Sequence, residues 1–287
     1  MKNNASDFAY PLITVIVAVF NGVETLQQCI NSVAEQTYPN KELIIIDGGS
    51  DDGTITLLEN NQSKISYWIS EPDSGIYNAW NKGIEEAKGE WICFLGADDY
   101  FWDECVLAKM SISLQNTPPS VRLSYAQIML LGTDDDALFP IGEPWEVVRS
   151  RFKRGECLPH PGMMHRRSLF IENGDFDESF QIGGDYELML RELKTADAAF
   201  IPDLISVAMR PGGVSNNPSN TIEVLRDVKR ARIKHNQPWP IFFWFKSSIR
   251  VYARLIFWKI IGETVTRKLL DLARRIKGLQ PYWTKTQ

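Results

Sequence analysis

The stretch Leu43-Ile-Ile-Ile-Asp47-Gly-Gly-Ser-Asp-Asp52-Gly-Thr54 decides the fold class of this chain. An aliphatic run ends abruptly in a carboxylate and glycines, which is typical of a strand buried on both faces of a parallel sheet. The pattern returns at Trp91-Ile-Cys-Phe-Leu-Gly-Ala-Asp98-Asp99. Ligands of open parallel sheets bind beyond the carboxyl ends of the strands. The two stretches therefore predict one acidic ligand site at one edge of a sheet.

The spacing of the other apolar runs predicts a doubly wound α/β domain. Strands are expected at residues 12–18, 42–46, 65–69 and 91–96, with helices between them at 23–36, 54–61 and 76–87. Further strands are expected at 121–131, 137–141 and 199–209, a helix around 184–191, and loops at 157–167 and 210–218. This alternation favours a Rossmann-like, mostly parallel central sheet flanked by helices.

Composition and cysteine usage indicate a folded cytosolic protein. The chain has 287 residues, of which 44% are hydrophobic and 23% charged, as in ordinary globular domains. Its four cysteines lie far apart, without zinc spacing, and are expected to be reduced thiols. The first residues lack the pattern of a secretory signal, and no uncharged apolar run reaches the roughly 18 residues of a spanning helix. We expect a cytoplasmic protein without a nucleic-acid partner.

The charge is distributed unevenly, which suggests a separate C-terminal tail. Residues 226–287 carry 15 Lys and Arg against three acids, whereas residues 1–225 carry 16 basic and 33 acidic side chains. Within 241–261, helical spacing places apolar side chains on one face: Phe242, Phe245, Ile249, Tyr252, Ile256 and Ile260. Lys246, Arg250 and Arg254 form an opposite stripe. Such a helix suits the inner face of an anionic membrane. The alternative is packing on the catalytic domain or on a second subunit of an oligomer.

Three acidic clusters have competing interpretations. Asp47 is either a ligand-binding residue or only a helix cap and turn residue. The Asp98-Asp99 pair is a better candidate for a divalent cation, Mn²⁺ or Mg²⁺, because one cap does not need two adjacent acids at a buried strand end. The run Asp134-Asp135-Asp136 lies between two expected strands and is interpreted as a solvated turn.

Five motifs together resemble family 2 glycosyltransferases with the GT-A fold. They are residues 11–21, 43–54, 70–83, 87–99 and 176–187, the last containing Gly184-Asp185-Tyr-Glu187. The resemblance covers residues 10–215 and implies inverting transfer of a sugar from a nucleotide-sugar to a hydroxyl acceptor. It also implies a GT-A catalytic domain over 1–220, with a nucleotide-sugar half at 10–100 and an acceptor half at 101–220. Residues 221–287 then form the helical basic and aromatic tail.

The resemblance assigns roles to individual residues. Nucleotide-sugar binding falls to Phe20, Asn21, Asp47, Gly49, Asp73, Asn81, Lys82, Ala97 and Asp98. Phe20 and Asn21 are expected beside the nucleotide base, with Asp47 accepting a hydrogen bond from it. Asp98 and Asp99 match the metal-binding motif, although the family usually has an acid where this chain has Gly96. Asp185 matches the catalytic base, with Glu187 ranked second. His160 is a weaker candidate for contacting the acceptor or the leaving group.

Substrate and reaction class are left partly open by the residues. An ionised carboxylate only accepts hydrogen bonds, which favours UDP- or dTDP-sugars because uracil and thymine carry a ring N–H, and GDP-sugars stay possible. A hexose or N-acetylhexosamine is expected as the donor sugar, with a glycan or lipid-linked acceptor in cell-surface polysaccharide biosynthesis. One alternative is a non-catalytic nucleotide-sugar-binding protein. The other is a nucleotidyltransferase, but residues 19–22 do not supply its Gly-rich, basic loop.

Overall fold

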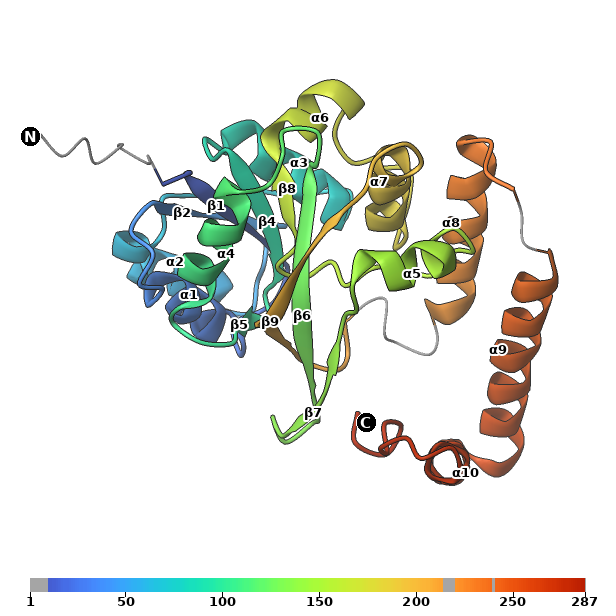
Figure 1. Ribbon diagram of the computed structural model, residues 1–287. Coiled ribbons are helices and arrows are strands. Elements are labelled where there is room, and N and C mark those ends of the chain that lie inside the picture. Colours follow the sequence, from blue (N-terminus) through green and yellow to red (C-terminus); the bar gives the residue numbers. More distant parts are fainter. Residues whose placement is uncertain (1–9, 214–219, 239–240, 287) are drawn as a thin grey trace, which may run out of the picture.

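The protein folds around a nine-stranded sheet covered by helices (Figure 1). The computed structural model describes residues 10–213, 220–238 and 241–286. The strands are β1 Ile13–Val19, β2 Lys41–Asp47, β3 Tyr67–Ser70, β4 Trp91–Gly96, β5 Tyr100–Phe101, β6 Leu123–Leu131, β7 Ala137–Ile141, β8 Met164–Arg166 and β9 Ala199–Met209. The helices are α1 Leu26–Ala34, α2 Thr54–Asn60, α3 Ile76–Glu86, α4 Val106–Gln115, α5 Trp145–Phe152, α6 Arg167–Asn173, α7 Gly184–Leu193, α8 Thr221–Lys234, α9 Ile241–Ile261 and α10 Glu263–Ile276. The expected α/β class is confirmed.

The N-terminal half of the sheet is parallel and contains a topological switch point. The strand order β3-β2-β1-β4 places β1 between β2 and β4. The register pairs Val19 with Asp47 and Ala18 with Gly96, so these three strands end at the same edge. Because the chain runs to opposite sides from β1, the carboxyl edge of these strands is the place where ligands of such sheets bind.

The second half of the sheet is mixed. β8 pairs antiparallel with β4 and β6, β6 runs parallel to β9, and β5 and β7 are antiparallel edge pairings. The strands expected at 121–131, 137–141 and 199–209 are confirmed as β6, β7 and β9. The expectation of a continuous loop at 157–167 is wrong, because it contains β8 and the start of α6. Residues 214–218 of the other expected loop lie outside the described residues.

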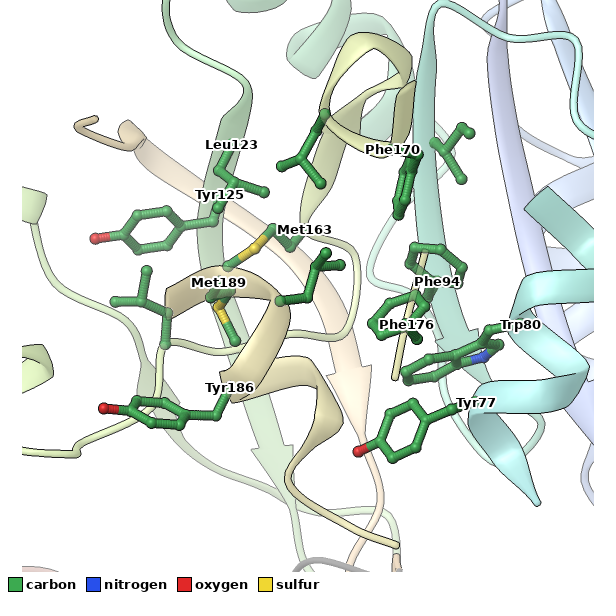
Figure 2. Packing of buried hydrophobic residues seen from close by; sticks show 14 of the residues in the cluster. Tyr77, Trp80, Phe94, Leu123, Tyr125, Met163, Phe170, Phe176, Tyr186 and Met189 are labelled. Atoms are coloured by element: carbon green, nitrogen blue, oxygen red, sulfur yellow. The ribbon is translucent and has the colours of Figure 1, made fainter. Parts of the chain in front are cut away.

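Two cores cover the two faces of the sheet. Along β1 the alternate residues Ile13, Val15 and Val17 join the core beneath α1 and α4, whereas Ile16 joins the other core. This alternation follows from the period of two along a strand. The second core contains aromatic rings from α3, β4 and the loop before α7, among them Trp80 and Phe94 (Figure 2). It packs helix α7 against the sheet.

The C-terminal helices extend from the body and return to it. α8 packs on α7, α9 runs along one side, and α10 leads back toward β7 (Figure 1). The amide of Thr133 donates to the carbonyl of Lys285 at 2.9 Å, and Lys285 forms an ion pair with Asp136 at 3.1 Å. Residues 134–136 lie in the solvated β6–β7 turn, as expected, and Asp135 in addition pairs with Arg210 at 2.7 Å.

None of the helices within the described ranges is long and apolar enough to cross a membrane.

Candidate functional site

Asp47 orders the turn that follows β2. Its carboxylate is fully buried and accepts hydrogen bonds from the amides of Gly49 at 3.2 Å and Ser50 at 3.0 Å. It also accepts from the hydroxyls of Ser50 and Ser70. Protein donors thus engage both carboxylate oxygens, so Asp47 holds the shape of the turn.

The turn after β2 is joined to the end of β1. The amide of Asn21 donates to the Ser50 hydroxyl at 2.7 Å, and its side-chain oxygen accepts the amide of Asp51 at 3.0 Å. Phe20, beside it, is 67% exposed. A Cβ atom placed on Gly48 would lie 3.4 Å from the Phe20 ring and 2.8 Å from the Asp73 carboxylate. The structure therefore brings Phe20, Asn21, Asp47, Gly49 and Asp73 together, with an exposed ring available for stacking.

Two further predicted donor-site residues lie on α3. Lys82 forms an ion pair with Glu71 at 2.7 Å and donates to the carbonyl of Pro72 at 3.3 Å, so it borders the segment that carries Asp73. Asn81 is engaged elsewhere: its amide donates to the Phe176 carbonyl at 3.0 Å and to Glu178 at 2.8 Å. Asn81 therefore ties α3 to the loop before α7.

The carboxylates of Asp98 and Asp99 converge above Gly96 at the end of β4. A Cβ atom placed on Gly96 would lie 2.6 Å from Oδ1 of Asp98 and 3.1 Å from Oδ2 of Asp99. The space that a side chain at position 96 would enter is thus occupied by these two carboxylates. Ala97 packs beside the turn after β1, 3.6 Å from a Cβ atom placed on Gly22. The acidic pair therefore borders the Phe20–Asn21 segment.

The acidic pair is electrostatically crowded. Burial raises the pKa of Asp98, and burial together with the neighbouring Asp98 raises the pKa of Asp99 to about 8. Arg210, after β9, donates its amide to Oδ1 of Asp99 at 3.1 Å and its guanidinium to the main-chain oxygen of Asp98 at 3.2 Å. The guanidinium forms its ion pair with Asp135. Negative charge on the pair is thus disfavoured in the absence of a further cation.

This donor set fits a divalent cation held jointly by protein and ligand. Within the described residues, no three or more His, Cys, Asp or Glu side chains group together as a complete metal site. Mg²⁺ is commonly held by one or two carboxylates together with phosphate oxygens and water. Two converging carboxylates at a ligand crevice match that pattern, so Asp98 and Asp99 would hold the ion while a bound diphosphate completes its shell.

Asp185 lies in the first turn of α7 and is partly buried. Burial raises the pKa of this carboxyl to about 6, although the amide of Tyr186 donates to it at 2.7 Å. The thiol of Cys157 lies 3.9 Å away. A carboxylate with a pKa about one unit below neutral suits general-base catalysis near pH 7.

Two other predicted candidates lie in the interior. Glu187 is fully buried and pairs with Lys234 at 2.7 Å, His235 at 2.6 Å and Arg191 at 3.0 Å, so its position is that of a structural ion pair. His160 is 7% exposed and stacks on Phe94, with ring centroids 5.6 Å apart. Burial holds the pKa of His160 well below its usual range, so its ring is neutral in the aromatic core.

Sequence reasoning missed two residues around the site, Arg210 and Asp227, and gave Tyr77 a different part. Tyr77 and Asp227 contact the loop that precedes Asp185, and Arg210 contacts the acidic pair. Tyr77 lies in the motif at 70–83, where its ring suggests either stacking on a sugar or core packing, and the structure buries it in the core. Asp227 is one of the few acids in a basic segment, and nothing in the sequence shows what it faces.

Comparisons with known proteins agree with this geometry. The model of Glycosyl transferase family 2 matches residues 14–121. A "PGL/p-HBAD biosynthesis glycosyltransferase" of Mycobacterium bovis is 30% identical over 225 residues, covering 77% of this chain and 84% of the relative. An uncharacterized glycosyltransferase of Mycobacterium tuberculosis is 33% identical over 184 residues, covering 63% and 68%.

Solved structures share the fold at low sequence identity. Staphylococcus aureus TarS 1–349, in complex with UDP-GlcNAc, has a TM-score of 0.61 at 18% identity, covering 77% of this chain and 66% of that one. The chain spans 39% of the longer TarS structure. The mannosyltransferase PcManGT from Pyrobaculum calidifontis, in complex with GDP-Man and Mn²⁺, has a TM-score of 0.62 at 17% identity, covering 97% and 84%. These neighbours are GT-A glycosyltransferases, so the expected GT-A fold is confirmed. The chain belongs to glycosyl transferase family 2 and is a glycosyltransferase.

Proposed function

We propose that this enzyme is an inverting, metal-dependent glycosyltransferase that moves a sugar from a nucleoside diphosphate to a hydroxyl of a glycan or lipid-linked acceptor. We further assign it to cell-surface polysaccharide biosynthesis. The observation that carries the proposal is the convergence of Asp98 and Asp99 over Gly96 at the switch point of the sheet. An acidic pair of this kind matches a cation and a diphosphate bound together.

Each of the candidate site residues has a proposed role. Asp98 and Asp99 would hold Mn²⁺ or Mg²⁺, which neutralises charge on a departing diphosphate. The exposed Phe20 ring and the turn held by Asn21 and Asp47 would receive the nucleoside. The acceptor hydroxyl would attack the sugar on the face opposite the leaving group, and this attack inverts the anomeric centre. Asp185 would take the proton of that hydroxyl.

The donor is proposed at the level of chemical class. The structural neighbours bind UDP-GlcNAc and GDP-Man. The test therefore includes donors with uridine and with guanosine, and donors that carry a hexose or an N-acetylhexosamine. We favour a UDP- or dTDP-sugar and keep GDP-sugars as the second choice.

A donor screen tests the proposal. Purified protein is incubated with UDP-, dTDP-, GDP- and ADP-sugars in Mn²⁺ or Mg²⁺, and release of the nucleoside diphosphate is measured. Release with one donor, lost in EDTA and in Asp98→Asn, supports the proposal. Tight nucleotide binding without turnover, unchanged by Asp185→Asn, would instead identify a non-catalytic binding protein. Turnover at full rate in EDTA would overturn metal dependence.

We also propose that the tail docks on the cytoplasmic face of an anionic membrane. The six apolar residues expected on one face of α9 are all 51–81% exposed, and on α10 Val265, Leu269, Leu272 and Ile276 are 49–79% exposed. Exposed cations accompany them: Lys246, Arg250, Lys259, Lys268 and Arg275. Each basic side chain near an anionic surface contributes about 1 kcal/mol of attraction.

Arg254, which was expected in the basic stripe, makes contacts within the protein. Arg254 is half-buried, stacks over Trp283 at 4.9 Å and donates to Thr221 at 2.7 Å. It therefore holds the C-terminal segment against α9 and is not available to lipid headgroups. The exposed cations border the apolar stripes, as an interfacial helix requires.

Vesicle sedimentation of the full chain tests the docking proposal. The variant Phe242→Ser/Phe245→Ser/Ile249→Ser is compared with Ile112→Ser/Ile171→Ser, which alters exposed apolar residues of the body. Binding to phosphatidylserine vesicles at low salt should be lost in the first variant and kept in the second. If the wild type stays in the supernatant and light scattering shows a dimer that the first variant breaks, a second copy covers this face instead.

A further inference from the structure

Two glycines before the proposed base allow other elements to approach it closely. A Cβ atom placed on Gly183 would lie 2.7 Å from Cβ of Asp227, on α8. A Cβ atom on Gly184 would lie 2.8 Å from the ring of Tyr77, on α3. Both distances are too short for any larger residue, so the chain at 183–184 is fitted between α8 and α3. Asp185 follows directly.

Asp227 anchors the loop from the side of α8. One carboxylate oxygen, Oδ2, accepts the amides of Gln181 at 3.2 Å, Ile182 at 3.0 Å and Gly183 at 3.0 Å. The side chain is 8% exposed. Hydrogen bonds to an ionised acceptor are stronger than neutral ones, and here three converge on one atom. The sequence gives no reason to expect this contact from a segment otherwise rich in Lys and Arg.

Tyr77 anchors the same loop from the side of α3. Its hydroxyl accepts the amides of Gly184 at 2.8 Å and Asp185 at 3.4 Å, and donates to the carbonyl of Ile182. Its ring is fixed between Trp80 and Phe176, with centroids 5.6 Å and 5.5 Å away (Figure 2). Because α3 begins just after the Asp73 segment, this hydroxyl links the donor side of the site to the base.

We propose that Tyr77 and Asp227 are positioning residues that together fix the backbone of Asp185 for proton transfer. The proposal rests on the proposed function, since it assumes that Asp185 is the base. Neither residue has to touch substrate. A displacement of a catalytic group by about 1 Å can cost about 100-fold in rate, so the loop geometry controls turnover more than donor binding.

Charge and hydrogen bonding of Asp227 can be separated by substitution. The groups that act on Asp185 are the Cys157 thiol, the Tyr77 hydroxyl and the Asp227 carboxylate. Asp227→Asn keeps an acceptor oxygen but removes a negative charge that raises the pKa of Asp185. Asp227→Ala removes both. Tyr77→Phe removes only the hydroxyl and keeps the packed ring.

The experiment combines amide hydrogen exchange with kinetics on the full chain. Glu223→Ala is the matched control, because Glu223 is an acid one turn earlier on α8 and pairs with Arg226 on the same helix. In Asp227→Ala and Tyr77→Phe, amides 181–185 should exchange at least about tenfold faster than in the wild type and in the control. With the donor found active, kcat should fall by about tenfold or more while the donor KM changes less than about twofold. Asp227→Asn should retain more kcat than Asp227→Ala and shift the acidic limb of its pH profile to lower pH.

Several results would overturn the proposal. One is amide exchange at 181–185 in Asp227→Ala and Tyr77→Phe that matches exchange in Glu223→Ala. A second is a rise in donor KM as large as the fall in kcat in these two variants. A third is a fall of kcat in Glu223→Ala that equals the fall in Asp227→Ala. If Asp227→Ala does not fold, Tyr77→Phe and Asp227→Asn carry the same comparison. If the wild type turns over no donor, the proposed function fails. Exchange at amides 181–185 then still decides whether these residues hold the loop, and exchange that matches the control contradicts it.

Discussion

The backbone amide of Arg210 donates a 3.1 Å hydrogen bond to Oδ1 of Asp99, which ties the end of β9 to the acidic end of β4. The guanidinium of the same residue turns to Asp135, 2.7 Å away. One residue therefore braces the acidic pair through its main chain while its charge is paired with a different carboxylate. In the proposed function, a divalent cation neutralises the charge of Asp98 and Asp99.

Removal of the metal should weaken nucleotide binding. We expect the affinity for UDP or GDP, measured by calorimetry in Mn²⁺, to fall at least about tenfold in EDTA. Asp98→Asn should bind weakly in both buffers, because one of the two converging carboxylates is lost. Asp134→Asn, an exposed acid in the β6–β7 turn, should behave as wild type. Equal affinities of the wild type and Asp98→Asn, each measured in Mn²⁺ and in EDTA, would rule out a metal at this site.

Asp185→Asn should lose about 10²- to 10⁴-fold in transfer rate yet bind the donor normally, since it removes only the proton acceptor. With the pKa of Asp185 at about 6, the wild-type rate should fall as pH decreases through that value, because the protonated carboxyl cannot accept a proton. Initial rates measured across this range check both points. A flat profile with near-full turnover in the variant would remove the assignment.

Asp47→Asn should weaken nucleotide binding through the turn rather than by direct contact. The asparagine oxygen can still accept the amides of Gly49 and Ser50, which share one carboxylate oxygen of Asp47, but its NH₂ group replaces the oxygen that accepts the Ser50 hydroxyl. That hydroxyl must then reorient, which disturbs the turn. Calorimetric titration of UDP is the measurement, with Asp51→Asn as the exposed neighbouring control. Similar affinities in the two variants would show that the turn does not shape the nucleotide site.

Glu187→Ala should destabilise the fold by about 3 kcal/mol, because removing one partner leaves buried charges unpaired. The carboxylate is fully buried and pairs with Arg191 on α7 and with Lys234 and His235 at the end of α8. These pairs join the two helices. Urea unfolding gives the free-energy difference. A loss below about 1 kcal/mol, like that of an exposed pair such as Glu223–Arg226, would contradict this interpretation.

The sequence predicted the donor half better than the rest, for physical reasons. Strands β1, β2 and β4 are uninterrupted aliphatic runs, and burial on both faces leaves a pattern that needs no other information. β5 and β8 have two and three residues, too few to show any period. The acids Asp98, Asp99 and Asp185 could be named as candidates because their motifs are local.

Contacts made over long separations were not predictable. The four protein donors around Asp47 come from the turn and from Ser70 on β3, and only the folded sheet brings Ser70 there. Asp227 meets its amides across more than 40 residues of chain. The stripe on α9 was anticipated, whereas the inward turn of Arg254 depends on Trp283, in a different segment.

The position of Asp227 has a consequence for how the chain can be divided. A fragment ending at residue 220 keeps every strand of the donor half and the base itself. It lacks the single oxygen that receives three amides of the loop before that base. Under the proposed function, such a fragment would bind a nucleotide and fail to turn it over. During synthesis, likewise, Asp227 emerges after Asp47, Asp98, Asp99 and Arg210, so the loop before Asp185 acquires this support last.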